Sequence, residues 1–71
     1  MAVTVKYLSN VTTTEELIDS SVATVRSRYK GAFSMPDGVT AFVNDVSAGD
    51  SDIVEDGDVI EFRKSHGEKG N

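Results

Sequence analysis

The side chains that could carry chemistry in this chain are mainly carboxylates, because its 71 residues include no cysteine and a single histidine. The lack of thiols excludes disulfides and thiolate zinc sites. Any metal would have to be bound by carboxylates, which suit calcium or magnesium. The densest acidic run, residues 50–58, puts Val54 at the fifth position of a calcium loop that begins at Asp50, where an oxygen ligand is needed. We therefore expect a solvated, turn-rich edge there, with no metal and no other cofactor.

The single histidine, His66, lies in a tail of residues 64–71 that contains no apolar side chain. Acid–base catalysis requires a histidine held against a fixed partner, and this polar segment offers none. A segment of this composition is expected to be mobile. The sequence thus predicts no catalytic residue and a protein that is not an enzyme.

Periodicity predicts three strands that would position the remaining groups. Residues 2–8 alternate with a period of two and are rich in β-branched and aromatic side chains, as is typical of a half-buried strand. Residues 39–43 and 58–63 predict two more strands, the last introduced by an Asp-Gly turn. Residues 44–51 are polar and irregular. Because a chain this short supports one core, we expect one domain over residues 1–63, followed by the tail.

The segment between the first two strands admits two interpretations. In the first, Thr13 caps a long helix, Glu16 completes a capping box, and apolar side chains recur on one face up to Tyr29. The local signals slightly favour this helix. Against it, the threonines of residues 12–14 are poor helix formers and favour a strand.

In the second interpretation the same segment is a hairpin followed by a shorter helix. Residues 9–10 then form the turn and residues 11–17 form a strand. Asp19 or Ser20 would cap a helix that runs to about Lys30. Both interpretations are compatible with the local composition, so the choice depends on the C-terminal half of the chain.

The C-terminal half resembles the β-grasp sulfur carriers, which are the small subunit of molybdopterin synthase and the thiamine sulfur carrier, relatives of ubiquitin. Their pattern is a strand ending in Val-Asn-Gly, a short loop, and Asp-Gly-Asp before an alternating last strand. This chain has Val43-Asn44-Asp45 and then Glu55-Asp56-Gly57-Asp58-Val59-Ile60-Glu61-Phe62. TGS domains share the pattern, so it points to the superfamily more than to one branch.

Elementary conformational preferences account for the matching residues. Asn44 tolerates the left-handed conformation found at the end of a strand. Gly57 supplies the positive φ of a tight turn, and Asp56 and Asp58 can bond free amides of that turn. The match covers residues 39–63 well and the N-terminal half only in general layout.

The resemblance implies an α+β fold, a β-grasp in which a mixed sheet of four or five strands packs on one helix. Such a fold begins with a hairpin and one helix, which selects the second interpretation. We therefore expect residues 11–17 to pair with residues 2–8 and the helix to begin at about Ser20. The expected core consists of Val3, Val5, Leu17, Val22, Val25, Tyr29, Val39, Val43, Ile53, Ile60 and Phe62.

Alternation also predicts which apolar side chains point away from this core. If Val39 and Ile60 face inward, Phe42 and Val59 face outward, and Leu8 falls on the same side. A contiguous exposed apolar patch usually marks a partner surface. We predict that Leu8, Phe42 and Val59 bind a partner. A local register shift, or cover by the tail, is the alternative explanation.

The C-terminus departs from the family, whose members end in Gly-Gly and are adenylated and then thiolated or conjugated there. This chain ends in Gly70-Asn71 and contains no Gly-Gly pair. Processing after Gly67 or Gly70 would expose His66-Gly67 or Lys69-Gly70. Because a terminal side chain would obstruct the narrow channel of the activating enzyme, we expect no adenylation of the full chain at Asn71.

Charge and hydropathy limit the partners. Twelve acids against seven bases give a net charge of −5, which disfavours nucleic acid. No apolar run approaches the ~20 residues of a membrane span, and no signal-peptide pattern follows Met1. We expect a cytoplasmic, acidic small protein that is monomeric in isolation and binds another protein.

Three functions stay open. The first is a non-catalytic protein-interaction module, an adaptor or accessory domain recognised through its sheet. The second is a sulfur carrier or ubiquitin-like modifier that acts through a processed C-terminus. The third is a TGS-like ligand- or RNA-binding domain, which the net charge disfavours.

Overall fold

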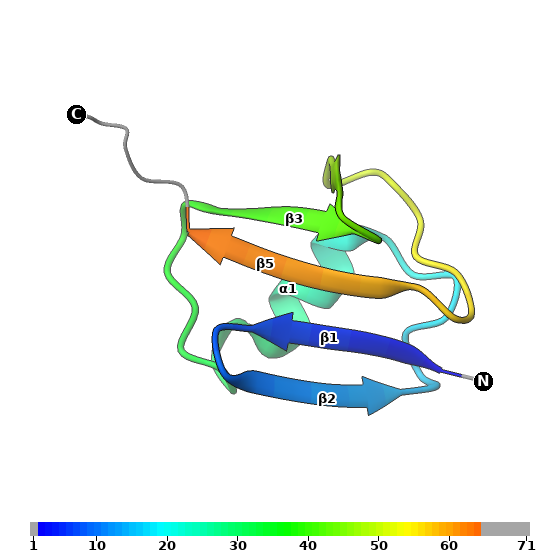
Figure 1. Cartoon of the computed structure of the whole chain (residues 1–71), viewed down its shortest axis with the longest axis horizontal. Coiled ribbons are helices and arrows are strands. Elements are labelled where there is room, and N and C mark those ends of the chain that lie inside the picture. The colour runs from blue at the N-terminus through cyan, green and yellow to red at the C-terminus, as the bar shows by residue number, and fades with distance from the viewer. Residues whose placement is uncertain (1, 65–71) are drawn as a thin grey trace.

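The chain forms a five-stranded mixed sheet with one helix packed against one of its faces (Figure 1). The structure is a computed structural model that describes residues 2–64. The elements are β1 (Val3–Tyr7), β2 (Asn10–Thr14), α1 (Val22–Lys30), β3 (Val39–Val43), β4 (Val46–Ala48) and β5 (Val59–Lys64).

The strand order β2-β1-β5-β3-β4 confirms the predicted α+β fold and its β-grasp arrangement. The first and last strands, β1 and β5, lie side by side and run parallel, and every other neighbouring pair is antiparallel. The helix supplies the crossover between the two hairpins. Among the described residues, no helix is long and apolar enough to span a membrane.

The N-terminal hairpin confirms the second of the two interpretations. β1 pairs with β2 from Val3 opposite Thr14 to Tyr7 opposite Asn10. The strand is shorter than the predicted residues 11–17, because the Thr14 hydroxyl accepts a hydrogen bond from the Glu16 amide and a turn begins there. The hairpin turn lies one residue earlier than predicted, at residues 8–9.

The helix begins at Val22, two residues later than predicted, and Ser21 rather than Asp19 or Ser20 is its cap. The Ser21 hydroxyl accepts a hydrogen bond from the Thr24 amide over 3.2 Å, which satisfies one of the free amides of the first turn. Asp19 has a left-handed φ of 68°. The carbonyl of Ser20 accepts from the Val54 amide. Both positions are thus held by the segment before β5 and cannot join the helix, which ends at Lys30 as predicted.

Residues 44–51, predicted to be irregular, contain the short strand β4. Asn44 and Asp45 have φ values of 50° and 71°, the two successive left-handed residues of a tight hairpin turn. Val43 therefore pairs with Val46, and Ala41 pairs with Ala48. The Asn-Asp pair was the signal for this hairpin, and the polar composition of the segment concealed it.

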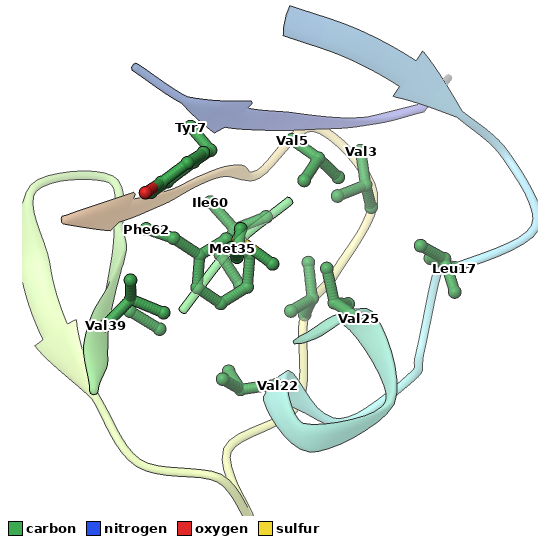
Figure 2. Close-up of a cluster of buried hydrophobic side chains, with 12 residues drawn as sticks. Val3, Val5, Tyr7, Leu17, Val22, Val25, Met35, Val39, Ile60 and Phe62 are labelled. Atoms are coloured by element: carbon green, nitrogen blue, oxygen red, sulfur yellow. The ribbon is translucent and has the colours of Figure 1, made fainter. Parts of the chain in front are cut away.

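The core lies between α1 and the inner face of the sheet (Figure 2). Eight of the eleven predicted core residues are buried there, and Tyr29 and Val43 pack at its margin. Tyr7, Met35 and Ala41 are buried although they were not predicted. The residues predicted and found in the core are Val3, Val5, Leu17, Val22, Val25, Val39, Ile60 and Phe62.

The prediction that Ile53 belongs to the core is wrong, because its neighbour Val54 takes that place. Ile53 is 52% exposed, whereas Val54 is 0% exposed. The backbone of Val54 is fixed on both sides, since its amide donates to Ser20 and its carbonyl accepts from Asp19. These bonds turn the Val54 side chain inward, and the alternation of an extended segment then turns Ile53 outward.

Candidate functional site

A hydrogen-bonded bridge joins the end of β3 to the start of β5. The Asn44 side-chain amide donates to Asp58 Oδ1 over 3.0 Å, and Asn44 Oδ1 accepts from the Val59 amide over 3.0 Å. The Asn44 backbone amide also donates to the Val59 carbonyl. The two halves of the motif that carried the resemblance are therefore in direct contact.

The turn before β5 is held by the remaining residues of that motif. Gly57 has a φ of 88°, as its position in the Asp-Gly-Asp sequence predicts. Its amide donates to the Ala2 carbonyl over 3.0 Å, and Asp58 Oδ2 accepts from the Glu55 amide over 2.8 Å. The turn thus fixes where β5 starts and which of its side chains reach each face of the sheet.

The face of the sheet opposite α1 carries a hollow of about 290 Å³. Phe42 and Val59 supply its apolar lining, and charged or polar side chains surround them. Across the centre, Lys6 on β1 is in register with Glu61 on β5, which in turn is in register with Phe42 on β3. The lining residues are Lys6, Phe42, Asn44, Asp45, Val59 and Glu61.

The Arg63 guanidinium lies over the Phe42 ring, with its carbon 4.1 Å from the ring centroid. One of its terminal nitrogens donates to Glu61 over 2.9 Å and to Asp45 over 3.0 Å. The Nε of Arg63 also donates to Glu61, over 3.1 Å. The hydrogen bonds to Glu61 raise the pKa of Arg63 above its ordinary value. An aromatic ring and two carboxylates therefore hold one cation at the edge of the hollow.

Of the three predicted partner-binding residues, the structure brings Phe42 and Val59 together in the hollow and places Leu8 elsewhere. Leu8 is 63% exposed and has a φ of 55° in the β1–β2 turn. On the β1–β5 ladder, Val59 is opposite Thr4, while Tyr7 is opposite Phe62. Leu8 therefore lies beyond the far end of that ladder and does not line the hollow.

The basic side chains of the helix and the last strand do not gather into one patch. Arg26 lies over Phe62 on the inner face, whereas Arg63 lies over Phe42 on the outer face. Arg26 also donates to the Val39 carbonyl and to Asp50. The other two helix bases are paired with acids as well, Arg28 with Glu16 and Lys30 with Asp37.

Acidic side chains of residues 50–58 form hydrogen bonds with nearby backbone amides and an ion pair with a neighbouring base. Asp50 pairs with Arg26, and Asp52 accepts from the Gly49 amide over 2.9 Å. Within the part of the chain that the structure describes, no three acidic or histidine side chains are grouped so as to hold a metal ion. His66, Gly67, Gly70 and Asn71, which the sequence singled out, lie outside the described residues.

The predicted partner surface left out the charged part of this site, because only the outward-facing apolar side chains were assigned to it. Alternation along β5 places Glu61 and Arg63 on the same face as Val59, and this signal was present in the sequence. The position of Lys6 beside Glu61 could not be predicted in the same way. Its neighbour on β5 is set by the parallel pairing of two strands more than fifty residues apart.

The fold and the hollow define a β-grasp α+β domain with an exposed, mixed apolar and charged sheet face. No protein-family model, no curated protein and no solved structure matches this chain.

Proposed function

We propose that this chain is a non-catalytic protein-interaction module of the β-grasp superfamily that binds another protein through the face of its sheet opposite α1. One observation carries the proposal. The helix covers one face, and within residues 2–64 no other helix or strand lies over the opposite face (Figure 1). On that opposite face Phe42 and Val59 line a hollow. Concave surfaces with an apolar floor and a few polar groups are typical binding sites.

The placement of Phe42 supports a role in binding more than in folding. Its ring is only partly buried and is covered on one side by Arg63. Val59, which shares the hollow, is 36% exposed. A partly exposed side chain outside the core cluster contributes less to folding than a core residue does, whereas an aromatic anchor buried at an interface is worth about 2 kcal/mol or more.

The support for a protein partner comes from the kind of surface that surrounds the hollow. An apolar centre with a charged rim is the usual anatomy of a protein–protein interface. The net charge of −5 disfavours nucleic acid and also opposes self-association. We therefore expect a monomer in isolation and a single protein partner at this face.

A pair of matched variants tests the proposal. The wild-type chain serves as bait in host lysate, and the captured protein is purified and its affinity measured by calorimetry against each variant. Phe42→Ala should weaken this binding strongly, whereas Ile53→Ala, which removes a more exposed apolar side chain outside the hollow, should not. Equal affinities of the two variants for the captured protein would refute binding at this face.

The second candidate function is a sulfur carrier or ubiquitin-like modifier that acts through a processed C-terminus. The contact of Asn44 with Asp58 favours it, because these residues belong to the two halves of the motif shared with sulfur carriers. The intact mass of the protein isolated from its host is the test. A thiocarboxylate or a conjugate would support this candidate, and an unmodified chain under all growth conditions would refute it.

A further inference from the structure

The open face already binds one guanidinium, which belongs to the chain itself. Arg63 places this group over the Phe42 ring and against the carboxylates of Asp45 and Glu61. A planar cation suits this arrangement, because it can stack on a ring with one surface and donate hydrogen bonds from its edge. The contacts of Arg63 thus show that the ring and the two carboxylates together can bind a guanidinium.

The charge of the molecule favours the binding of another cation in place of Arg63. Among the residues that line it, Lys6 contributes one positive charge, and Asp45 and Glu61 contribute two negative charges. The chain as a whole carries a net charge of −5. With Arg63 held against the two carboxylates, the charges of the site balance. A positively charged ligand is therefore attracted by the net charge of the molecule, and by the hollow once Arg63 has turned away.

Arg63 is held in a way that allows another group to replace it. Its side chain is 42% exposed, and its two carboxylate partners are on the surface of the same face. Exposed ion pairs of this kind contribute little to stability and are screened by salt. A displaced Arg63 loses contacts with Phe42, Asp45 and Glu61, none of which belongs to the core, and can turn into solvent, so replacement leaves the fold intact.

We propose that the hollow recognises an arginine side chain of the partner protein, which replaces Arg63 over Phe42 and between Asp45 and Glu61. The inference rests on the proposed function and names the chemistry of the partner. Arginine is favoured over lysine, because the planar guanidinium stacks on a ring and presents its donors in a fixed fork, whereas an ammonium is a compact, strongly hydrated point charge. The rest of the partner segment lies along the hollow toward Val59.

This arrangement makes Arg63 an internal competitor of the partner. Its removal is expected to tighten binding, which is the opposite of what removing an ordinary interface residue does. Removal of Glu61 or Asp45 should weaken binding, since each carboxylate holds the incoming guanidinium. Binding should thus become tighter when Arg63 is removed and weaker when either carboxylate is removed. A general loss of surface charge would not change the affinity in opposite directions.

The probe is an acetylated and amidated Gly-Arg-Gly peptide, titrated into the labelled full chain and followed by NMR. The matched control peptide contains citrulline, which has nearly the same shape and no charge. We expect the arginine peptide to shift the resonances of Phe42, Val59 and Glu61. The dissociation constant should be about threefold lower for Arg63→Ala than for the wild type, and the citrulline peptide should bind neither.

Double variants show whether the carboxylates bind the peptide directly, because Arg63, which they also hold, is absent from both. In the Arg63→Ala background, Glu61→Gln and Asp45→Asn should each weaken peptide binding, whereas Asp56→Asn, which changes an exposed acid outside the hollow, should not. Arg63→Gln serves as a second variant if Arg63→Ala fails to fold. Equal affinity for both peptides, or no gain on removal of Arg63, would overturn the inference. If Phe42→Ala still abolishes binding of the captured protein in that case, the proposed function survives without it.

Discussion

The side-chain amide of Asn44 donates a hydrogen bond of 3.0 Å to the Asp58 carboxylate, joining the end of β3 to the turn that precedes β5. The same side chain accepts from the Val59 amide. Asn44 also has a left-handed φ of 50°. One residue thus satisfies the turn conformation and the start of the last strand together, which explains why an asparagine suits this position.

Substitution of Asn44 should destabilise the domain for two separable reasons. Asn44→Ala loses both side-chain hydrogen bonds and places alanine in a left-handed conformation, and should lower the free energy of unfolding by about 1–3 kcal/mol. Asn44→Gly keeps the backbone conformation and loses only the hydrogen bonds, so it should cost less. Urea unfolding measures both, and a smaller cost for alanine than for glycine would contradict this account.

The neighbours Ile53 and Val54 should respond very differently to truncation. Val54 is buried, and Val54→Ala should cost about 2 kcal/mol because it leaves a cavity between the sheet and the helix. Ile53 is 52% exposed, and Ile53→Ala should change stability by no more than about 0.5 kcal/mol. Chemical denaturation of the two variants is the measurement. Similar costs for both would show that the segment is packed differently.

The contrast between these two residues shows where sequence reasoning fails for this fold. The strands β1, β3 and β5 were predictable, because each contains enough alternating residues to define an inner and an outer face. The segment before β5 is too short for a period to be read. Which of Ile53 and Val54 turns inward depends on hydrogen bonds to Asp19 and Ser20, which the local sequence does not encode.

The site was predictable to the extent that it depends on alternation. Phe42 and Val59 were placed on one face in this way, and the structure brings them together in the hollow. Leu8 was placed by counting along β1, but the strand ends at Tyr7 and the hairpin turn redirects the next residue. The position of Arg63 over Phe42 depends on the conformation of its side chain and on Asp45 in the β3–β4 turn. No local sequence pattern reveals either.

The ion pair between Lys30 and Asp37 predicts a titration anomaly at the end of the helix. The hydrogen bond from Lys30 holds the pKa of Asp37 below its ordinary value of 3.8. Because the folded-state pKa is lowered, the pair stabilises the fold above the unfolded-state pKa, and this contribution is lost as the pH falls through the folded-state pKa. Carboxyl NMR titration should show the shift, and Lys30→Gln should return the pKa of Asp37 toward its ordinary value. An unchanged Asp37 titration in that variant would assign the shift to another cause.

The two phenylalanines on opposite faces of the sheet provide the sharpest test of the strand facing. Phe62 is buried and lies beneath the Arg26 guanidinium, whose carbon is 5.5 Å from the ring centroid. Phe62→Ala should therefore cost about 3–5 kcal/mol, a large part of the stability of so small a domain. Phe42→Ala removes a partly exposed ring from the other face, so it should leave the melting temperature nearly unchanged and weaken partner binding. Thermal unfolding of both variants beside the wild type decides the matter. If Phe42→Ala unfolds the protein while Phe62→Ala is tolerated, the facing of β3 and β5 is inverted and the proposed binding surface does not exist.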